Sequence, residues 1–68
     1  MSHWHPGYVY AIHGRLNESD KHLTRITDWV RNRESLYPKL TQLRSNDNAD
    51  GIAWGDYEIK MISADWLA

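Results

Sequence analysis

The first apolar segment of the chain, residues 7–13, has the pattern of a β-strand. Successive side chains of a strand point to opposite faces. The two expected faces carry Tyr8, Tyr10 and Ile12 on one side and Val9, Ala11 and His13 on the other. Both faces are largely apolar, which favours a central strand or one covered on both sides. We expect Gly14 to end the strand.

Residues 20–33 show helical spacing instead. One apolar stripe recurs at i, i+3 and i+7, and consists of Leu23, Ile26 and Val30. This spacing predicts an amphipathic helix. Residues 17–20 supply capping and acidic side chains that suit a helix N-terminus. Trp29 lies at the edge of the stripe, so we expect its ring to be partly exposed.

Pro38 interrupts this helical pattern. A residue before proline is driven out of the helical region, so Tyr37 is expected to end the first helix. Proline suits a first helical turn, and residues 38–44 therefore predict a second, short helix. Its expected inner face consists of Leu36, Leu40 and Leu43. One kinked helix is the alternative. Residues 45–51 are rich in turn formers and predict a polar loop.

Gly55 and Asp56 lie between two apolar segments, residues 52–54 and 57–62. This arrangement predicts a β-hairpin with a two-residue turn. The expected cross-strand pairs are Trp54 with Tyr57 and Ile52 with Ile59. Alternation in the second segment places Tyr57, Ile59 and Met61 on one face, with Glu58 and Lys60 on the other.

Together these elements predict one α+β domain spanning residues 1–68: a strand, one or two helices and a β-hairpin. The hairpin and first strand would form a three-stranded antiparallel sheet with a helical layer on one face. Residues 1–6 are expected to be a flexible N-terminus. Residues 63–68 are expected to form one helical turn. A domain this short buries only about 60% of its unfolded surface, so a partner would help it.

Large amphipathic aromatic residues are the most unusual part of the composition: four Trp and four Tyr, with no Phe. Their polar tips need a partner or water, and Trp and Tyr dominate interface hot spots. Tyr10, Trp54 and Tyr57 are expected to fill the core. The candidate interface residues are the aromatic ones at edges, breaks and termini with two nearby arginines: Trp4, Trp29, Tyr37, Trp66, Arg25 and Arg31.

The formal net charge is only −1, but the charges are unevenly spread. Seven of the eight Lys and Arg residues lie within residues 15–44, and the C-terminal third is acidic. An alternative function is therefore a nucleic-acid-binding regulator, with aromatic stacking beside a basic helix. The basic residues of that helix would be Lys21, Arg25, Arg31, Lys39 and Arg44. Acidic residues interleave with them, which weakens this alternative.

Candidate metal ligands are few. His3 and His5 flank Trp4 near the N-terminus, where imidazole and backbone nitrogens suit Cu(II) or Ni(II). Two ligands in a mobile segment fall short of the three or four that a site needs. Residues 46–51 resemble the start of a calcium loop, but Tyr57 stands where that loop needs a bidentate Glu. We therefore expect no metal or cofactor.

Catalytic residues are not expected either. His13 and His22 could act as an acid and base if the strand and helix brought them together. Neither a nucleophile with its base nor a glycine-rich anion loop accompanies them. The chain is therefore not expected to be an enzyme.

The favoured hypothesis is a small protein-binding module that inhibits or modulates a larger protein by occupying its surface. Chains of this size are common among phage and mobile-element accessory proteins, and an antitoxin fits equally well. A second copy of the chain is an alternative partner. The chain lacks Cys, an apolar run long enough to span a membrane and a signal-peptide pattern, which favours a cytoplasmic location without membrane contact.

Overall fold

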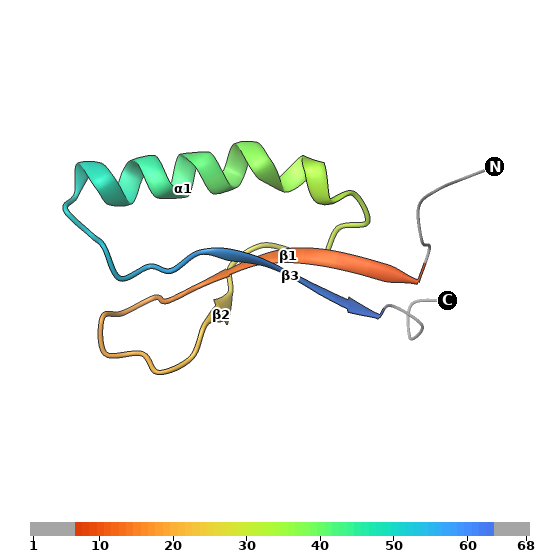
Figure 1. Ribbon diagram of the computed structural model, residues 1–68, viewed down its shortest axis with the longest axis horizontal. Coiled ribbons are helices and arrows are strands. Elements are labelled where there is room, and N and C mark those ends of the chain that lie inside the picture. The colour runs from red at the N-terminus through yellow and green to blue at the C-terminus, as the bar shows by residue number, and fades with distance from the viewer. Residues whose placement is uncertain (1–6, 64–68) are drawn as a thin grey trace.

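The computed structural model describes residues 7–63, with one helix packed beside a three-stranded antiparallel sheet (Figure 1). The elements in chain order are β1 (Tyr8–Gly14), β2 (Thr24–Arg25), the 3-10 turn η1 (Arg33–Leu36), α1 (Tyr37–Ala49) and β3 (Glu58–Ser63). The predicted α+β class is confirmed. The predictions for residues 1–6 and for a helical turn after residue 63 lie outside the described residues.

β1 is the central strand, as its apolar faces predicted. The strand order is β2-β1-β3, with both neighbours antiparallel to β1. Val9 is 1% exposed, and Ala11 and Ile12 are fully buried. Because Ala11 and Ile12 are consecutive, they point to opposite faces of the strand. β1 is therefore covered on both sides.

The helix after the proline is also confirmed, with Pro38 in its first turn. The inner stripe consists of Leu36, which is buried, and Leu40 and Leu43, which are half-buried. The helix continues to Ala49, so the loop predicted at residues 45–51 is wrong. Asp47 extends the inner stripe, and its carboxylate accepts a hydrogen bond from the Tyr57 side chain. This contact anchors the polar last turns of α1. Gly51, with φ of 73°, follows the C-cap in the left-handed conformation typical of helix ends.

The helix predicted for residues 20–33 is wrong. This segment contains β2 and a further bridge in which Val30 and Tyr10 exchange two backbone hydrogen bonds of 2.7 and 2.8 Å. The apolar stripe residues Leu23, Ile26 and Val30 are only half-buried. Four β-branched residues, Thr24, Ile26, Thr27 and Val30, favour extended backbone. The N–H and C=O groups along this side of β1 supply hydrogen-bond partners for the extended segment, which completes the strand pairing.

A bulge interrupts this pairing. Between the pairs His13–Arg25 and Tyr10–Val30, β1 advances three residues while the opposite segment advances five. The Oγ1 atom of Thr27 fills the gap by accepting the Ile12 N–H at 3.1 Å. A side chain therefore replaces a backbone partner within the bulge, and the edge remains hydrogen-bonded but irregular.

The two-residue hairpin at Gly55 and Asp56 is wrong as well. β3 pairs with β1, so Ile59 lies opposite Ile12, and the Ile52 N–H instead donates to the Asp47 carbonyl at 2.7 Å. Alternation specifies the faces of a strand but not its partner, and β1 offers a longer ladder than residues 52–54.

Asp56 forms a kink between α1 and β3, with a positive φ of 51°. Arg15 holds the kink in place. Its side chain forms an ion pair with Asp56, and its N–H donates to the Gly55 carbonyl at 2.7 Å. Gly55 and Asp56, which were predicted to form a hairpin turn, therefore connect the segment before β3 to the end of β1.

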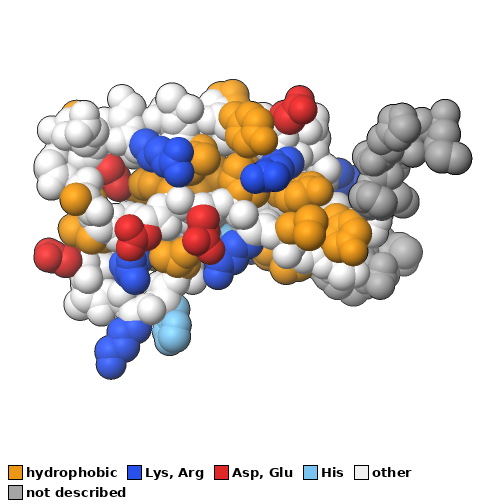
Figure 2. All heavy atoms as spheres, viewed as in Figure 1, with side chains coloured by type: hydrophobic (Ala, Val, Ile, Leu, Met, Phe, Trp, Pro, Cys, Tyr) orange, Lys and Arg blue, Asp and Glu red, His pale blue; other side chains and the backbone are white. Residues whose placement is uncertain are grey.

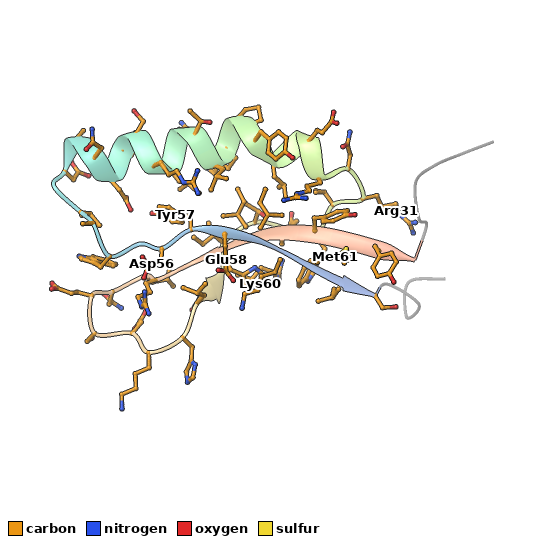
Figure 3. All side chains as sticks on the ribbon, viewed as in Figure 1. Arg31, Asp56, Tyr57, Glu58, Lys60 and Met61 are labelled. Carbon is orange, nitrogen blue, oxygen red and sulfur yellow. The ribbon has the colours of Figure 1, made fainter. Side chains whose placement is uncertain are left out.

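The predicted faces of β3 are confirmed: Tyr57, just before β3, points toward the helix, and Glu58 and Lys60 point to the other side (Figure 3). The Tyr57 ring lies against Gly14, where a Cβ atom would collide with ring atom Cδ1 and come within 2.7 Å of Cε1. Gly14 is thus needed for close packing of this ring.

Candidate protein-binding site

An open pocket of about 770 Å³ lies where β1 meets η1 and the start of α1. Its lining consists of Tyr10, Arg31, Asn32, Arg33, Glu34 and Tyr37. Figure 2 shows apolar side chains reaching the surface between the helix and the sheet, with basic side chains among them. We call this feature the tyrosine pocket.

Two elements position the tyrosines. Tyr10 lies on the helix-facing side of β1, and its backbone is held by both hydrogen bonds to Val30. Tyr37 begins α1 and is 46% exposed. An apolar ring with a polar hydroxyl suits a half-open position of this kind. The pocket therefore offers aromatic surface on a rigid strand and a helix end.

The turn before α1 positions the charged rim. The Oδ1 atom of Asn32 accepts the Glu34 N–H at 3.0 Å and caps η1. The Asn32 carbonyl accepts both the N–H and the hydroxyl of Ser35, at 3.1 and 2.7 Å. These bonds fix the turn from Asn32 to Ser35, which contains Arg33 and directly follows Arg31. Two arginines and one glutamate then give the rim a net positive charge.

A second aromatic cluster lies on the opposite face of the sheet. The Arg25 guanidinium is 5.7 Å from the centroid of the Trp29 ring, a cation–π distance. The Trp29 and His13 ring centroids are 5.6 Å apart. Arg25 also donates to the Thr27 carbonyl at 2.8 Å and lies 3.8 Å from Asp28. Local contacts therefore hold this arginine in place.

The candidate interface residues thus divide into two pairs. Arg31 and Tyr37 line the tyrosine pocket, whereas Arg25 and Trp29 pack together on the other face. The structure does not join the pairs into one patch, because His13 and Tyr10 point to opposite sides of β1. Trp4 and Trp66 lie outside the described residues.

Four residues of the pocket are absent from the sequence-based candidates: Tyr10, Asn32, Arg33 and Glu34. Tyr10 was expected in the core but is half-buried. The other three lie at or just beyond the end of the incorrectly predicted helix. The β-branched residues from Thr24 onward were the available signal, because they favour an edge strand. A strand there requires a turn before the helix at Pro38, and that turn contains these three residues.

The basic helix proposed for nucleic-acid binding is not present. Only Lys39 and Arg44 of its five basic residues lie on α1. Lys21 lies in the loop before β2, Arg25 lies in β2, and Arg31 follows the bridge at Val30, because this segment pairs with β1 instead of forming a helix. The predicted single basic face is therefore wrong.

A smaller pocket of about 410 Å³ lies between the end of α1 and residues 52–57. Its central contact is the hydrogen bond between the Tyr57 hydroxyl and the Asp47 carboxylate. This bond, burial and the Asp47 charge raise the pKa of Tyr57 to about 12. Because the neutral phenol is favoured, Tyr57 acts here as a structural donor and is poorly suited to be a base.

Residues 7–63 offer neither a metal site nor a membrane-spanning helix. No group of three or more His, Asp or Glu side chains there could hold a metal ion. No helix in the same range is both long and apolar enough to cross a membrane. The tyrosine pocket is therefore the principal candidate site in the described part of the chain.

Comparison with known proteins gave no match: no family model, curated protein or solved structure is similar to this chain.

Proposed function

We propose that this chain is a small, non-enzymatic protein-binding module that occupies a surface of a larger protein and thereby inhibits or modulates it. The observation that carries the proposal is the tyrosine pocket, in which Tyr10 and Tyr37 are combined with Arg31 and Arg33. Tyr and Arg are enriched where protein interfaces obtain most of their binding energy.

The pocket suits a partner that inserts an apolar or aromatic side chain flanked by carboxylates. The Tyr10 and Tyr37 rings would supply contact area at a small cost in side-chain entropy, because a tyrosine has few rotatable bonds. Arg31 and Arg33 would pair with carboxylates at the rim. Glu34 at the same rim would disfavour a uniformly acidic partner surface.

The charge distribution supports a protein partner over a nucleic acid. Arg15 is paired with Asp56, and Arg25 lies beside Asp28. Nucleic-acid affinity depends chiefly on cations that neutralise phosphates, and neighbouring carboxylates oppose that interaction. Nucleic-acid binding is therefore the less favoured proposal.

Differential affinity capture with the full chain tests the proposed function. Wild-type protein, Tyr37→Ala and Leu16→Ala would each be used as bait in host lysate, read by quantitative mass spectrometry. Leu16 is the matched control because it is 58% exposed and does not line the tyrosine pocket. A protein retained by wild type and Leu16→Ala, but reduced at least about tenfold by Tyr37→Ala, would support the proposal, as truncation of a hot spot costs about 2 kcal/mol or more.

Folding of both variants would be verified by circular dichroism. Equal capture by all three baits would contradict the proposal. Capture of nucleic acid in place of protein, with affinity falling steeply between low and physiological salt, would favour the alternative function.

A cytoplasmic site of action belongs to the same proposal. The absence of Cys from the sequence supports it, since proteins of reducing compartments rarely depend on disulfides. The phage or mobile-element accessory role also remains a proposal, supported by the small size of the chain.

A further inference from the structure

β3 forms an open edge of the sheet within the described residues. β1 lies on one side of it, and no strand of residues 7–63 lies on the other. The hydrogen-bond directions of β1 show which β3 groups face outward. Tyr10 and Ile12 direct their N–H and C=O groups toward the β2 side, to Val30, Ile26 and Thr27. Alternate residues of β1 therefore direct theirs toward β3.

The β1–β3 register shows which residues of β3 direct their backbone groups toward β1 and which direct them outward. Ala11 lies opposite Lys60, and His13 lies opposite Glu58, so these β3 residues direct their backbone groups inward. The N–H and C=O groups of Ile59 and Met61 consequently point outward from the sheet. They make no hydrogen bond within residues 7–63, which leaves a regular edge able to add a strand.

The charges on this edge are complementary to those of a second copy. Glu58 and Lys60 flank Ile59, and both side chains project from the face away from the helix (Figure 3). A two-fold axis at Ile59 would place each Glu58 opposite Lys60 of the second copy. Opposite charges at directly paired positions stabilise an antiparallel ladder, whereas like charges destabilise it.

We infer that this chain forms a homodimer by antiparallel pairing of its β3 strands, with the two-fold axis at Ile59. The Ile59 N–H of each copy donates to the Ile59 carbonyl of the other, which joins the two sheets into one. Met61, which is 55% exposed in the single chain, then lies opposite Tyr57 of the second copy. This inference is independent of the proposed function, because β3 does not line the tyrosine pocket.

Alternative registers are less favourable. An axis at Lys60 would set two lysines directly opposite each other and Glu58 opposite Ile62. An axis at Met61 would pair Lys60 with Ile62 and leave Glu58 without a basic residue opposite it. Within one copy, the Lys60 Nζ atom already lies 3.7 Å from the Glu58 carboxylate. Only the Ile59 register adds an opposite charge from the second copy beside each of these two residues, so charge complementarity across the interface selects it.

Charge reversal in the full-length chain tests this register. Sedimentation velocity or light scattering would measure dimerisation of wild type, Glu58→Lys and Lys60→Glu over a wide concentration range. Each single variant should dimerise at least about tenfold more weakly, because both cross-strand pairs become like-charged. Both side chains are exposed, so circular dichroism should show an unchanged fold.

An equimolar mixture of the two single variants provides the decisive comparison. One copy then presents two lysines and the other two glutamates, so the mixture should recover dimerisation to near the wild-type level. The double variant Glu58→Lys with Lys60→Glu should recover it as well. Recovery identifies the pairing, since a purely structural defect would not be repaired by mixing.

Amide hydrogen exchange gives an independent readout of the edge. Ile59 and Met61 should become protected as wild-type concentration rises, whereas Lys60 should be protected at all concentrations by its bond to β1.

A chain that stays monomeric at all concentrations up to about 1 mM would overturn the inference, because even a weak dimer with a Kd of about 1 mM would be detected there. A wild-type dimer unaffected by either charge reversal would also overturn it. Stronger association of wild type with Lys60→Glu than of wild type alone would replace it with the Lys60 register.

Discussion

The β2 edge of the sheet is short and irregular, whereas the β3 edge is longer and regular. β2 contains two residues, and a bulge in which Thr27 replaces a backbone partner separates it from Val30. β3 contains six residues in unbroken register with β1. Bulges and short strands discourage edge-to-edge pairing, and a regular edge permits it. Within residues 7–63 the chain therefore protects the β2 edge and leaves the β3 edge available.

The edges also differ in how their side chains are used. At the β2 edge, the Trp29 ring contacts both Arg25 and His13 of the same chain. At the β3 edge, Met61 and Ile62 are 55% and 37% exposed. Side chains that make their contacts within their own chain stabilise the monomer, whereas exposed apolar side chains are stabilised most when a partner removes them from water. Substitutions at the two edges should therefore affect different equilibria.

The largest effect is expected at the central strand on which both edges depend. Ile12→Ala should lower the free energy of unfolding by about 2–5 kcal/mol, because Ile12 is fully buried and truncation leaves a cavity. Ile62→Ala is the matched substitution on the β3 edge and should cost about 1 kcal/mol or less. Urea denaturation at low protein concentration measures both. Similar costs at the two sites would show that the edge is as well packed as the centre.

At the β2 edge, Thr27→Val should cost about 1–3 kcal/mol. The substitution preserves the shape of the side chain but leaves the Ile12 N–H without its acceptor. Thr24→Val is the control, because Thr24 is exposed, and it should change stability by less than about 0.5 kcal/mol. Equal effects in thermal denaturation would show that Thr27 does not close the bulge.

Alkaline pH should weaken the attachment between α1 and the start of β3. The pKa of Tyr57 is raised to about 12 in the folded chain, against about 10 in an unfolded one. Its contribution is therefore complete below pH 10 and is lost as the pH rises toward 12. Tyr57→Phe should cost about 1 kcal/mol at pH 8, as expected for one hydrogen bond.

The difference between wild type and Tyr57→Phe should shrink at pH 11 in the same denaturation experiment. Tyr37→Phe is the control, because Tyr37 is 46% exposed and lies at the start of α1, in the pocket away from Asp47. A wild-type advantage over Tyr57→Phe that stays constant from pH 8 to 11 would contradict the assigned bond to Asp47.

The smallest effect on monomer stability is expected at the open edge. Met61→Thr should change the unfolding free energy by less than about 0.5 kcal/mol, since the side chain is mostly exposed and threonine suits a strand. The measurement must be made at low concentration, where the chain is monomeric. A loss above about 1 kcal/mol would mean that Met61 is covered within a single chain.

Local pattern predicted much of the fold. The alternating apolar residues of β1, Pro38 at the start of α1 and the Leu36, Leu40 and Leu43 stripe all led to confirmed elements. Each of these signals lies within a few residues of the element that it specifies. The incorrect helix at residues 20–33 shows the limit, because a spacing of i, i+3 and i+7 competed with β-branched residues and tertiary pairing decided the outcome.

The candidate site was less predictable. Arg31 and Tyr37 were identified from composition and position, but their proximity to Tyr10 depends on the Tyr10–Val30 bridge. That bridge joins residues twenty positions apart and carries no local sequence signature. Asn32, Arg33 and Glu34 could not be assigned to a turn while the segment before them was expected to be a helix.

The sequence by itself determined which faces are apolar, where α1 begins and how the side chains of β3 alternate, because these properties depend on neighbouring residues. The tertiary structure decided which strands pair, that β3 joins β1 instead of residues 52–54, and that Thr27 closes a bulge. Those choices depend on which distant backbone groups and cavities are available, such as the space that Gly14 leaves for the Tyr57 ring. The sequence pattern shows that an apolar face must be covered, but it does not show which part of the chain covers it.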